Sequence, residues 1–210
     1  MTSEQLAALR RYLVTDIRAG SVERLVEICR AAIDGGMTTV QLRAKGWTDR
    51  QLLEAANALA PICRSSGALL IVNDRVDIAL AAGADGVHLG VDDLPVAAAR
   101  RLLGPAALIG YSPETLEDRI HAEQDGADYL GVGPVYGTTT KGDAGAAIGL
   151  DGIRAAVTAS PLPIVGIGGI GIDTARPVVE AGAVGVALVG AVFLSGDPRS
   201  AAAHLASALG

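Results

Sequence analysis

Aromatic residues are scarce in this chain, with four Tyr, one Trp and one Phe among 210 residues. A core with so few rings must be packed by small and branched side chains, and half of the residues are apolar. Cysteine is also scarce. Cys29 and Cys63 both fall in helical patterns, which predicts buried free thiols and not a disulfide or a ligand pair.

Long apolar runs and basic runs are absent. No stretch is long enough to cross a bilayer, and the N-terminus lacks the layout of a signal peptide, so we expect a cytoplasmic protein without a membrane partner. The formal net charge of −6 argues against nucleic acid as a partner. A chain of 210 residues suits one domain with a sizeable core.

Short apolar runs alternate with amphipathic segments along the whole chain, which predicts eight strands, each followed by a helix. This pattern indicates an α/β fold, a single (β/α)8 TIM barrel with a parallel eight-stranded core over residues 1–210. We expect strands at 12–16, 39–44, 68–72, 86–89, 107–111, 129–135, 163–167 and 185–189. The helices are expected at 22–33, 49–64, 76–82, 95–103, 114–124, 152–159, 174–181 and 200–209.

An open, doubly wound sheet is the main alternative architecture. Residues 166–171 even match the GxGxxG pattern of a dinucleotide site between a strand and a helix. The match falls late in the chain, and no acidic residue ends a strand about 20 residues further on, where the ribose would need one. The barrel is therefore favoured.

In a barrel, functional side chains lie at the carboxyl ends of the strands. The second predicted strand ends with a Gln and two cations at alternating positions, and alternation places all three on one face. A polar set of this kind at a barrel mouth is costly unless it meets polar groups, although the two cations could also extend into solvent. These residues are Gln41, Arg43 and Lys45.

Lysine is rare here, since only Lys45 and Lys141 are lysines among 17 basic residues. Lys141 follows three hydroxyl residues, Thr138, Thr139 and Thr140, after the sixth strand. Hydroxyl donors beside an ammonium form a cradle for an anion, whereas the plain alternative is a solvated loop.

Two carboxylates end neighbouring strands, Asp74 after the third and Asp93 after the fourth. They suit a hard divalent cation that bridges them to phosphate oxygens. They could instead form a general acid and base pair, and Asp93 could be a helix N-cap. Ser112 after the fifth strand is also an N-cap candidate, while His88 is expected inside the barrel and outside catalysis.

Glycine turns follow the seventh and eighth strands, where barrels commonly bind phosphate through backbone N–H groups. These turns contain Gly169 and the pair Val189 and Gly190. The chain thus offers one anion site with the charge for a diphosphate and another for a monophosphate. That combination suggests a transferase that releases pyrophosphate, with cations stabilising the charge on the leaving group.

Five motifs resemble, in order, those of the thiamine phosphate synthase family. They lie at residues 36–45, 73–77, 86–94, 131–141 and 167–170, so the resemblance covers nearly the whole chain. It implies that hydroxymethylpyrimidine diphosphate is joined to a thiazole phosphate, carboxylated for some members, to give thiamine phosphate and pyrophosphate. It further implies Mg²⁺ and a dissociative mechanism, in which the diphosphate leaves first and the thiazole nitrogen traps the pyrimidine cation.

The resemblance also implies roles for particular residues. Magnesium would be bound by Asp74 and Asp93. The pyrimidine diphosphate would be held by Gln41, Arg43, Lys45, Asn73, Ser112 and Lys141, of which Arg43, Lys45, Ser112 and Lys141 are the catalytic candidates. The thiazole phosphate would be held by Thr138, Thr139, Thr140, Gly169, Val189 and Gly190.

Two positions depart from the family pattern. Val91 stands where Gln is usual, and Gly190 stands where Ser is usual. If that hydroxyl binds phosphate, its loss costs about 1 kcal/mol of affinity. A thiazole tautomerase and a non-catalytic barrel that binds a thiamine precursor remain as alternatives, but the full set of cations and carboxylates favours the transferase. The oligomeric state is left open, a homo-oligomer included.

Overall fold

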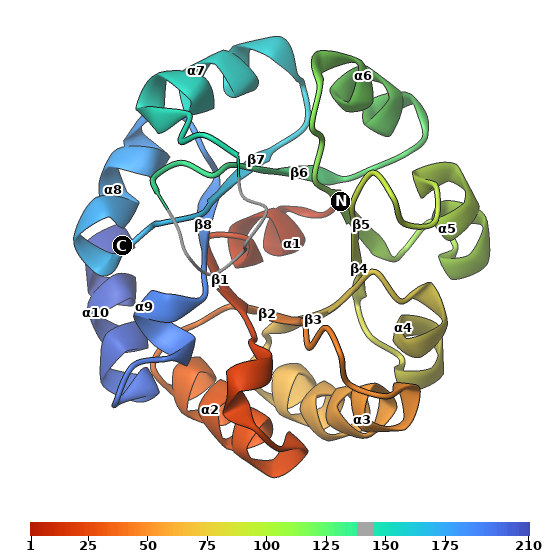
Figure 1. Cartoon of the computed structure of the whole chain (residues 1–210), viewed down its shortest axis with the longest axis vertical. Helices are drawn as coiled ribbons and strands as arrows, with labels where there is room; N and C mark the ends of the chain where they lie inside the picture. The colour runs from red at the N-terminus through yellow and green to blue at the C-terminus, as the bar shows by residue number, and fades with distance from the viewer. Residues whose placement is uncertain (138–144) are drawn as a thin grey trace.

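A computed structural model describes residues 1–137 and 145–210 of the chain. Eight parallel strands close into a barrel in the order β1 to β8, and helices surround it, so the predicted (β/α)8 fold is confirmed (Figure 1). The strands are β1 Arg11–Val14, β2 Thr39–Leu42, β3 Leu69–Asn73, β4 Gly86–Leu89, β5 Leu108–Tyr111, β6 Tyr129–Val132, β7 Ile164–Ile167 and β8 Gly185–Leu188.

The helices that follow the strands lie close to their predicted positions. They are α2 Val22–Asp34, α3 Asp49–Ser66, α4 Val76–Ala82, α5 Val96–Leu103, α6 Leu116–Gln124, α7 Gly149–Ala159, α8 Ile172–Glu180 and α10 Pro198–Leu209. Three short elements were not predicted, namely α1 Ser3–Ala8, the 3-10 turn η1 Ile17–Ala19 and α9 Gly190–Phe193. For α1 the sequence does carry a signal, since Thr2 and Gln5 form a capping box at its start.

Four predicted strands, those that became β1, β2, β6 and β8, were too long at their carboxyl ends, and at β2 and β6 a specific local feature explains why the backbone leaves the ladder. After β2, the Arg43 N–H donates to Thr15 Oγ1 (2.8 Å) and not to a neighbouring strand. After β6, Pro134 has no N–H to donate. The chain turns into loops at both places, and these loops carry site residues.

Alternation along the strands divides the apolar residues into two clusters. The outward side chains pack against the helices in a large cluster that includes Leu13, Val40 and Val72. The inward side chains form a smaller cluster that fills the barrel, with Tyr12, Ile71, Leu108, Tyr129 and Val165 among its members. Cys29 and Cys63 are buried free thiols, as predicted.

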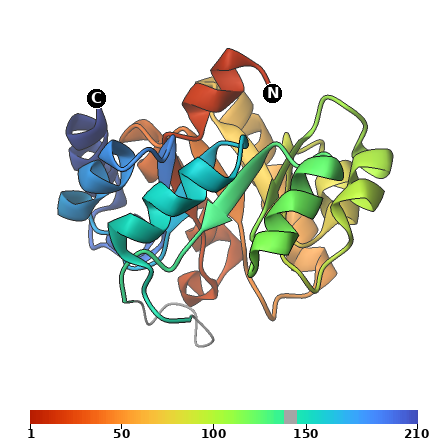
Figure 2. The same ribbon diagram turned by 90° about the horizontal axis from the view of Figure 1, so that it is seen from above.

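The end of the barrel where the strands begin is closed by α1, and both chain ends lie on this side (Figures 1 and 2). Two Gly-Ala-Asp turns, at residues 83–85 and 126–128, also lie at this end. Asp85 Oδ2 accepts a hydrogen bond from Leu70 N (2.8 Å), and Asp128 Oδ2 accepts one from Ile109 N (2.8 Å). Each carboxylate thus ties the start of one strand to the turn before the next.

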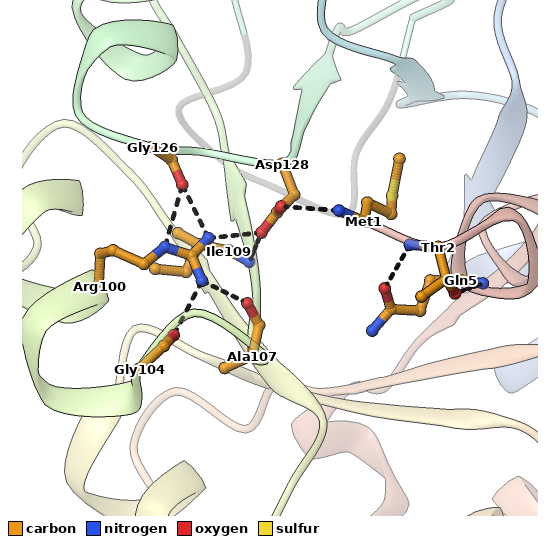
Figure 3. A network of polar contacts seen from close by, with 9 residues as sticks. All are labelled: Met1, Thr2, Gln5, Arg100, Gly104, Ala107, Ile109, Gly126 and Asp128. Atoms are coloured by element: carbon orange, nitrogen blue, oxygen red, sulfur yellow. Dashed lines mark hydrogen bonds and ion pairs between the residues drawn. The ribbon is translucent and has the colours of Figure 1, made fainter.

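Arg100 of α5 joins this same end, as Figure 3 shows. Its guanidinium donates to the carbonyls of Gly104 (3.0 Å), Ala107 (2.6 Å) and Gly126 (2.7 Å), and to Asp128 Oδ2 (2.6 Å). The Met1 amino group lies 3.8 Å from the other oxygen of Asp128. The closed end is therefore held by polar contacts. Functional sites of such barrels lie at the opposite end, where the strands finish. Within the described residues, no helix is long and apolar enough to cross a membrane.

Candidate active site

A cavity of about 1000 Å³ opens at the carboxyl ends of the strands. Every predicted site residue that the structure describes lines this cavity. These residues are Gln41, Arg43, Lys45, Asn73, Asp74, Asp93, Ser112, Gly169, Val189 and Gly190. The other four, Thr138, Thr139, Thr140 and Lys141, lie outside the described residues, although Gly137 and Gly145 on either side of that segment line the cavity.

The end of β2 is held by Thr15, which follows β1. The Thr15 hydroxyl donates to the Arg43 carbonyl (2.9 Å) and accepts from the Arg43 N–H (2.8 Å). Leu42 and Ala44 are buried, whereas Arg43 and Lys45 line the cavity, as alternation predicts. Both backbone groups of Arg43 are thus hydrogen-bonded, which fixes the backbone from which the two cationic side chains extend into the cavity.

Asp74 and Asp93 lie together at the ends of β3 and β4. Asp74 adopts a positive φ of 63°, and Asp93 Oδ2 accepts from Gly90 N (2.6 Å). Burial and then the neighbouring Asp93 carboxyl raise the pKa of Asp74, while Lys45, with Nζ 3.4 Å from Asp74 Oδ2, acts in the opposite direction. A bound cation would fit beside this pair, because it would favour the charged form of Asp74.

The cap interpretation of Asp93 is wrong, because α5 has Pro95 at its N-cap and no side-chain cap bond. In the described part of the chain, no group of three or more His, Cys, Asp or Glu side chains is placed to hold a metal. A cation here would therefore take two protein carboxylates and complete its shell with water and phosphate oxygens, which is how Mg²⁺ is commonly bound.

The glycine turn after β7 packs closely on the loop after β6. Gly168 and Gly169 have φ of 94° and 66°, and Tyr136 N donates to the Gly168 carbonyl (2.9 Å). A Cβ on Gly169 would overlap the backbone of Tyr136 and Gly137. Val189 and Gly190, where α9 begins, face the same cavity. Only a residue without a side chain allows the chain to approach this closely at position 169.

A hydrogen-bonded chain of polar side chains lines the floor of the cavity. It links Gln41 to Tyr12, Tyr129, His88 and Ser112 in that order. The N-cap interpretation of Ser112 is wrong, because Thr115 caps α6. His88 lies inside the barrel as predicted, and burial lowers its pKa to about 4, so it is neutral at pH 7.

Several residues that line the cavity were not predicted as site residues, among them Tyr12, Tyr129, Glu114 and Arg119. The two tyrosines occupy inward positions of β1 and β6, and strand alternation alone could have indicated that. Their contact with each other, between residues 117 positions apart, leaves no local signal.

These features define a (β/α)8 barrel with one cavity in which cations, paired carboxylates and glycine turns converge, an arrangement suited to phosphorylated ligands. The family model for thiamine monophosphate synthase matches residues 11–192, and the chain belongs to this family.

Similar proteins that carry this family's name agree with this assignment. A thiamine-phosphate synthase of Moorella thermoacetica is 48% identical over 194 residues, which is 92% of each chain. One from Chloroflexus aurantiacus is 49% identical and covers 98% of this chain and 94% of its own. The solved structure of a thiamine phosphate pyrophosphorylase from Pyrococcus furiosus has a TM-score of 0.88 and 39% identity, covering 98% and 97% of the two chains.

Proposed function

We propose that this protein is a transferase that joins hydroxymethylpyrimidine diphosphate to a thiazole phosphate, plain or carboxylated, and releases thiamine phosphate and pyrophosphate. The observation that carries this proposal is the convergence of the described candidate residues on one cavity in a chain of this family. We further propose the cytoplasm as its location and these small molecules, not nucleic acid, as its ligands.

The diphosphate end of the first substrate would meet Arg43 and Lys45 from β2, Asn73 from β3 and Ser112 after β5, all of which line the cavity. Lys141 would add a further charge. Asp74 and Asp93 would hold Mg²⁺, which supplies positive charge to the diphosphate oxygens as they leave. Gln41 would meet the pyrimidine.

The thiazole phosphate would bind on the other side of the cavity, at Gly169, Val189 and Gly190. Thr138, Thr139 and Thr140 would complete this subsite. A dissociative reaction suits the side chains, because it needs charge stabilisation on the leaving group and no protein nucleophile. Arg43 and Lys45 supply that charge from a fixed strand end.

Lys45 lies between the cationic part of the diphosphate subsite and the carboxylates that would hold Mg²⁺. Its Nζ lies 3.4 Å from Asp74 Oδ2, and its side chain is 62% exposed. Because the Lys45 ammonium is solvated, whereas the Asp74 side chain is 25% exposed, Lys45 can turn from the carboxylate to a phosphate oxygen without first leaving a buried position. Substrate binding would thereby release Asp74 for the cation.

The test is a product assay with both substrates, with and without Mg²⁺, and with each thiazole form in turn. We expect product only with Mg²⁺, and at least about a 100-fold lower turnover for Asp74→Asn and Asp93→Asn. Asp92→Asn is the matched control, because Asp92 is an exposed neighbour in the same turn, and it should stay within a few fold of the parent.

Other results would change the assignment. Thiazole phosphate that binds and isomerises without condensation would indicate a tautomerase. Binding without any turnover would indicate a non-catalytic barrel. Full activity of Asp74→Asn in the presence of a chelator would remove the magnesium site from the proposal.

A further inference from the structure

The interior polar chain, defined as Gln41, Tyr12, Tyr129, His88 and Ser112, crosses the barrel along the floor of the cavity. Gln41 Nε2 donates to Tyr12 Oη (2.9 Å), and the two tyrosine oxygens lie 2.8 Å apart. Tyr129 Oη is 3.2 Å from His88 Nδ1, and His88 Nε2 is 2.8 Å from Ser112 Oγ. Four hydrogen bonds thus connect the second strand to the end of the fifth.

The barrel makes room for this chain with glycine. At Gly110 a Cβ would overlap both Tyr129 and His88, and at Gly131 it would lie 3.0 Å from the His88 ring. Tyr12 is 1% exposed and Tyr129 is fully buried, so neither phenol has water as an alternative partner. Each phenol hydrogen must therefore find its acceptor within the interior polar chain.

The direction of the hydrogen bonds follows from the donor at one end. Gln41 Nε2 has hydrogens to give, so Tyr12 Oη accepts and its own hydrogen goes to Tyr129. The Tyr129 hydrogen then goes to His88 Nδ1. A neutral His88 with an acceptor at Nδ1 carries its hydrogen on Nε2, which donates to Ser112 Oγ. The Ser112 hydroxyl hydrogen is left free for the cavity.

With Gln41 Nε2 directed at Tyr12, the reverse direction leaves a buried hydrogen without a partner. If Ser112 donated to His88 Nε2, then His88 Nδ1 would donate to Tyr129, and Tyr129 would donate to Tyr12. Tyr12 Oη would accept twice, and within the described residues its own hydrogen has no acceptor besides the atoms already used. An unpaired hydroxyl in a buried site is unfavourable.

We propose that the interior polar chain orients Ser112 as a hydrogen-bond donor toward an anionic oxygen in the cavity, with His88 as a positioning residue in its Nε2–H tautomer. The orientation of Ser112 stands on the described contacts alone. Only the identity of the anion, a phosphoryl oxygen of the diphosphate ester, rests on the proposed function.

The tautomer is measured directly by NMR on ligand-free protein labelled with ¹⁵N-histidine at pH 8. The chain has three histidines, and the His88 signal is assigned by its loss in His88→Gln. Two-bond ¹H–¹⁵N correlations distinguish the Nε2–H from the Nδ1–H form. We expect Nε2–H, and a predominant Nδ1–H form would overturn the proposal.

Gln41→Glu tests whether the donor–acceptor direction is transmitted along the interior polar chain. An ionised carboxylate only accepts, so Tyr12, Tyr129, His88 and Ser112 should all reverse and His88 should change to Nδ1–H. Tyr12→Phe should keep Nε2–H, and the double variant should keep it too, because the phenylalanine interrupts the chain. The coupling between Gln41 and His88 would be refuted if a folded Gln41→Glu variant kept His88 in the Nε2–H form. It would also be refuted if His88 changed its tautomer in the double variant of Gln41→Glu and Tyr12→Phe.

A matched pair of variants connects the chain to turnover. The amide nitrogen of Gln can replace His88 Nε2 and donate to Ser112, whereas that of Asn lies near Nδ1 and cannot reach it. We expect His88→Asn to lower kcat about 10- to 100-fold, as Ser112→Ala does, and His88→Gln to retain more activity. The double variant of His88→Asn and Ser112→Ala should match Ser112→Ala alone, and fully additive losses would contradict the proposal.

The two proposals fail in different ways. If no variant and no parent protein makes product, the proposed function fails, yet the His88 tautomer still decides the orientation of Ser112. If product forms and His88 is in the Nδ1–H form, the orientation proposal fails and the proposed function stands.

Discussion

Gly190 lines the cavity and is one of the two positions at which the sequence is expected to depart from the family pattern. Among the residues that the structure describes, a Cβ at this position would meet no atom within 4 Å, and its φ is not positive. We predict that Gly190→Ser folds normally and binds the thiazole phosphate about 3- to 10-fold more tightly, because one hydroxyl donor is added. Titration calorimetry and KM would measure this effect, with little change in kcat.

Gly169→Ser provides the contrast for that experiment. Its φ is 66°, and a Cβ there would overlap the backbone after β6. This variant should lose affinity, stability or both. An unchanged affinity in a well-folded Gly190→Ser would show that the missing hydroxyl is not a phosphate ligand in this chain.

Single residues were predictable where one physical rule decides their direction. Alternation places Gln41 and Arg43 toward the cavity, since successive side chains point to opposite faces of a strand. The local rules for helix caps, applied to Asp93 and Ser112, left an alternative that the structure excludes. Both side chains have partners elsewhere, Gly90 N for Asp93 and His88 for Ser112.

At the scale of elements, the inward face of β5 is tightly constrained. Gly110 lies against the rings of Tyr129 and His88, and a Cβ would overlap both. We predict that Gly110→Ala lowers the free energy of unfolding by about 1–3 kcal/mol through overpacking. It should also perturb the His88 signal in NMR, because the ring must move.

Gly196→Ala is the control for that measurement. Gly196 lies between α9 and α10, and a Cβ there meets nothing within 4 Å. Its free energy of unfolding by urea should stay within about 0.5 kcal/mol of the parent. Equal stability of both variants would mean that the strand face tolerates the extra methyl.

Element types were predictable because the apolar period changes between strand and helix, whereas element ends depended on contacts that the period does not contain. The helix at 76–82 was predicted with its bounds, and a left-handed Gly83 ends it. The strand at 129–135 ended early because Pro134 cannot join the ladder. Short α9 has too few residues to show a helical period.

At the scale of the whole molecule, closure of the barrel was predictable from the count of strand and helix units, since each parallel step needs a crossover helix. The sequence indicated the role of only one of the two ends of the barrel. Motifs identified the functional end. The closed end depends on contacts of Arg100 with residues from a later turn, Gly126 and Asp128, which a local pattern does not contain.

Arg100 tests whether stability and activity reside at opposite ends of the molecule. We predict that Arg100→Met lowers the free energy of unfolding by about 2–4 kcal/mol, because the carbonyls of Gly104, Ala107 and Gly126 and the Asp128 carboxylate lose their donor. Urea unfolding would measure the loss, and exposed Arg101→Met is the matched control.

Activity is the second half of this test. Arg100 contacts the end where the strands begin, and the cavity lies where they finish, so kcat of the folded Arg100→Met variant should stay within a few fold of the parent. The variant should lose activity only at the temperature or urea concentration at which it unfolds. A large fall in kcat of fully folded protein would mean that packing along β5 and β6 transmits changes at the closed end to Ser112.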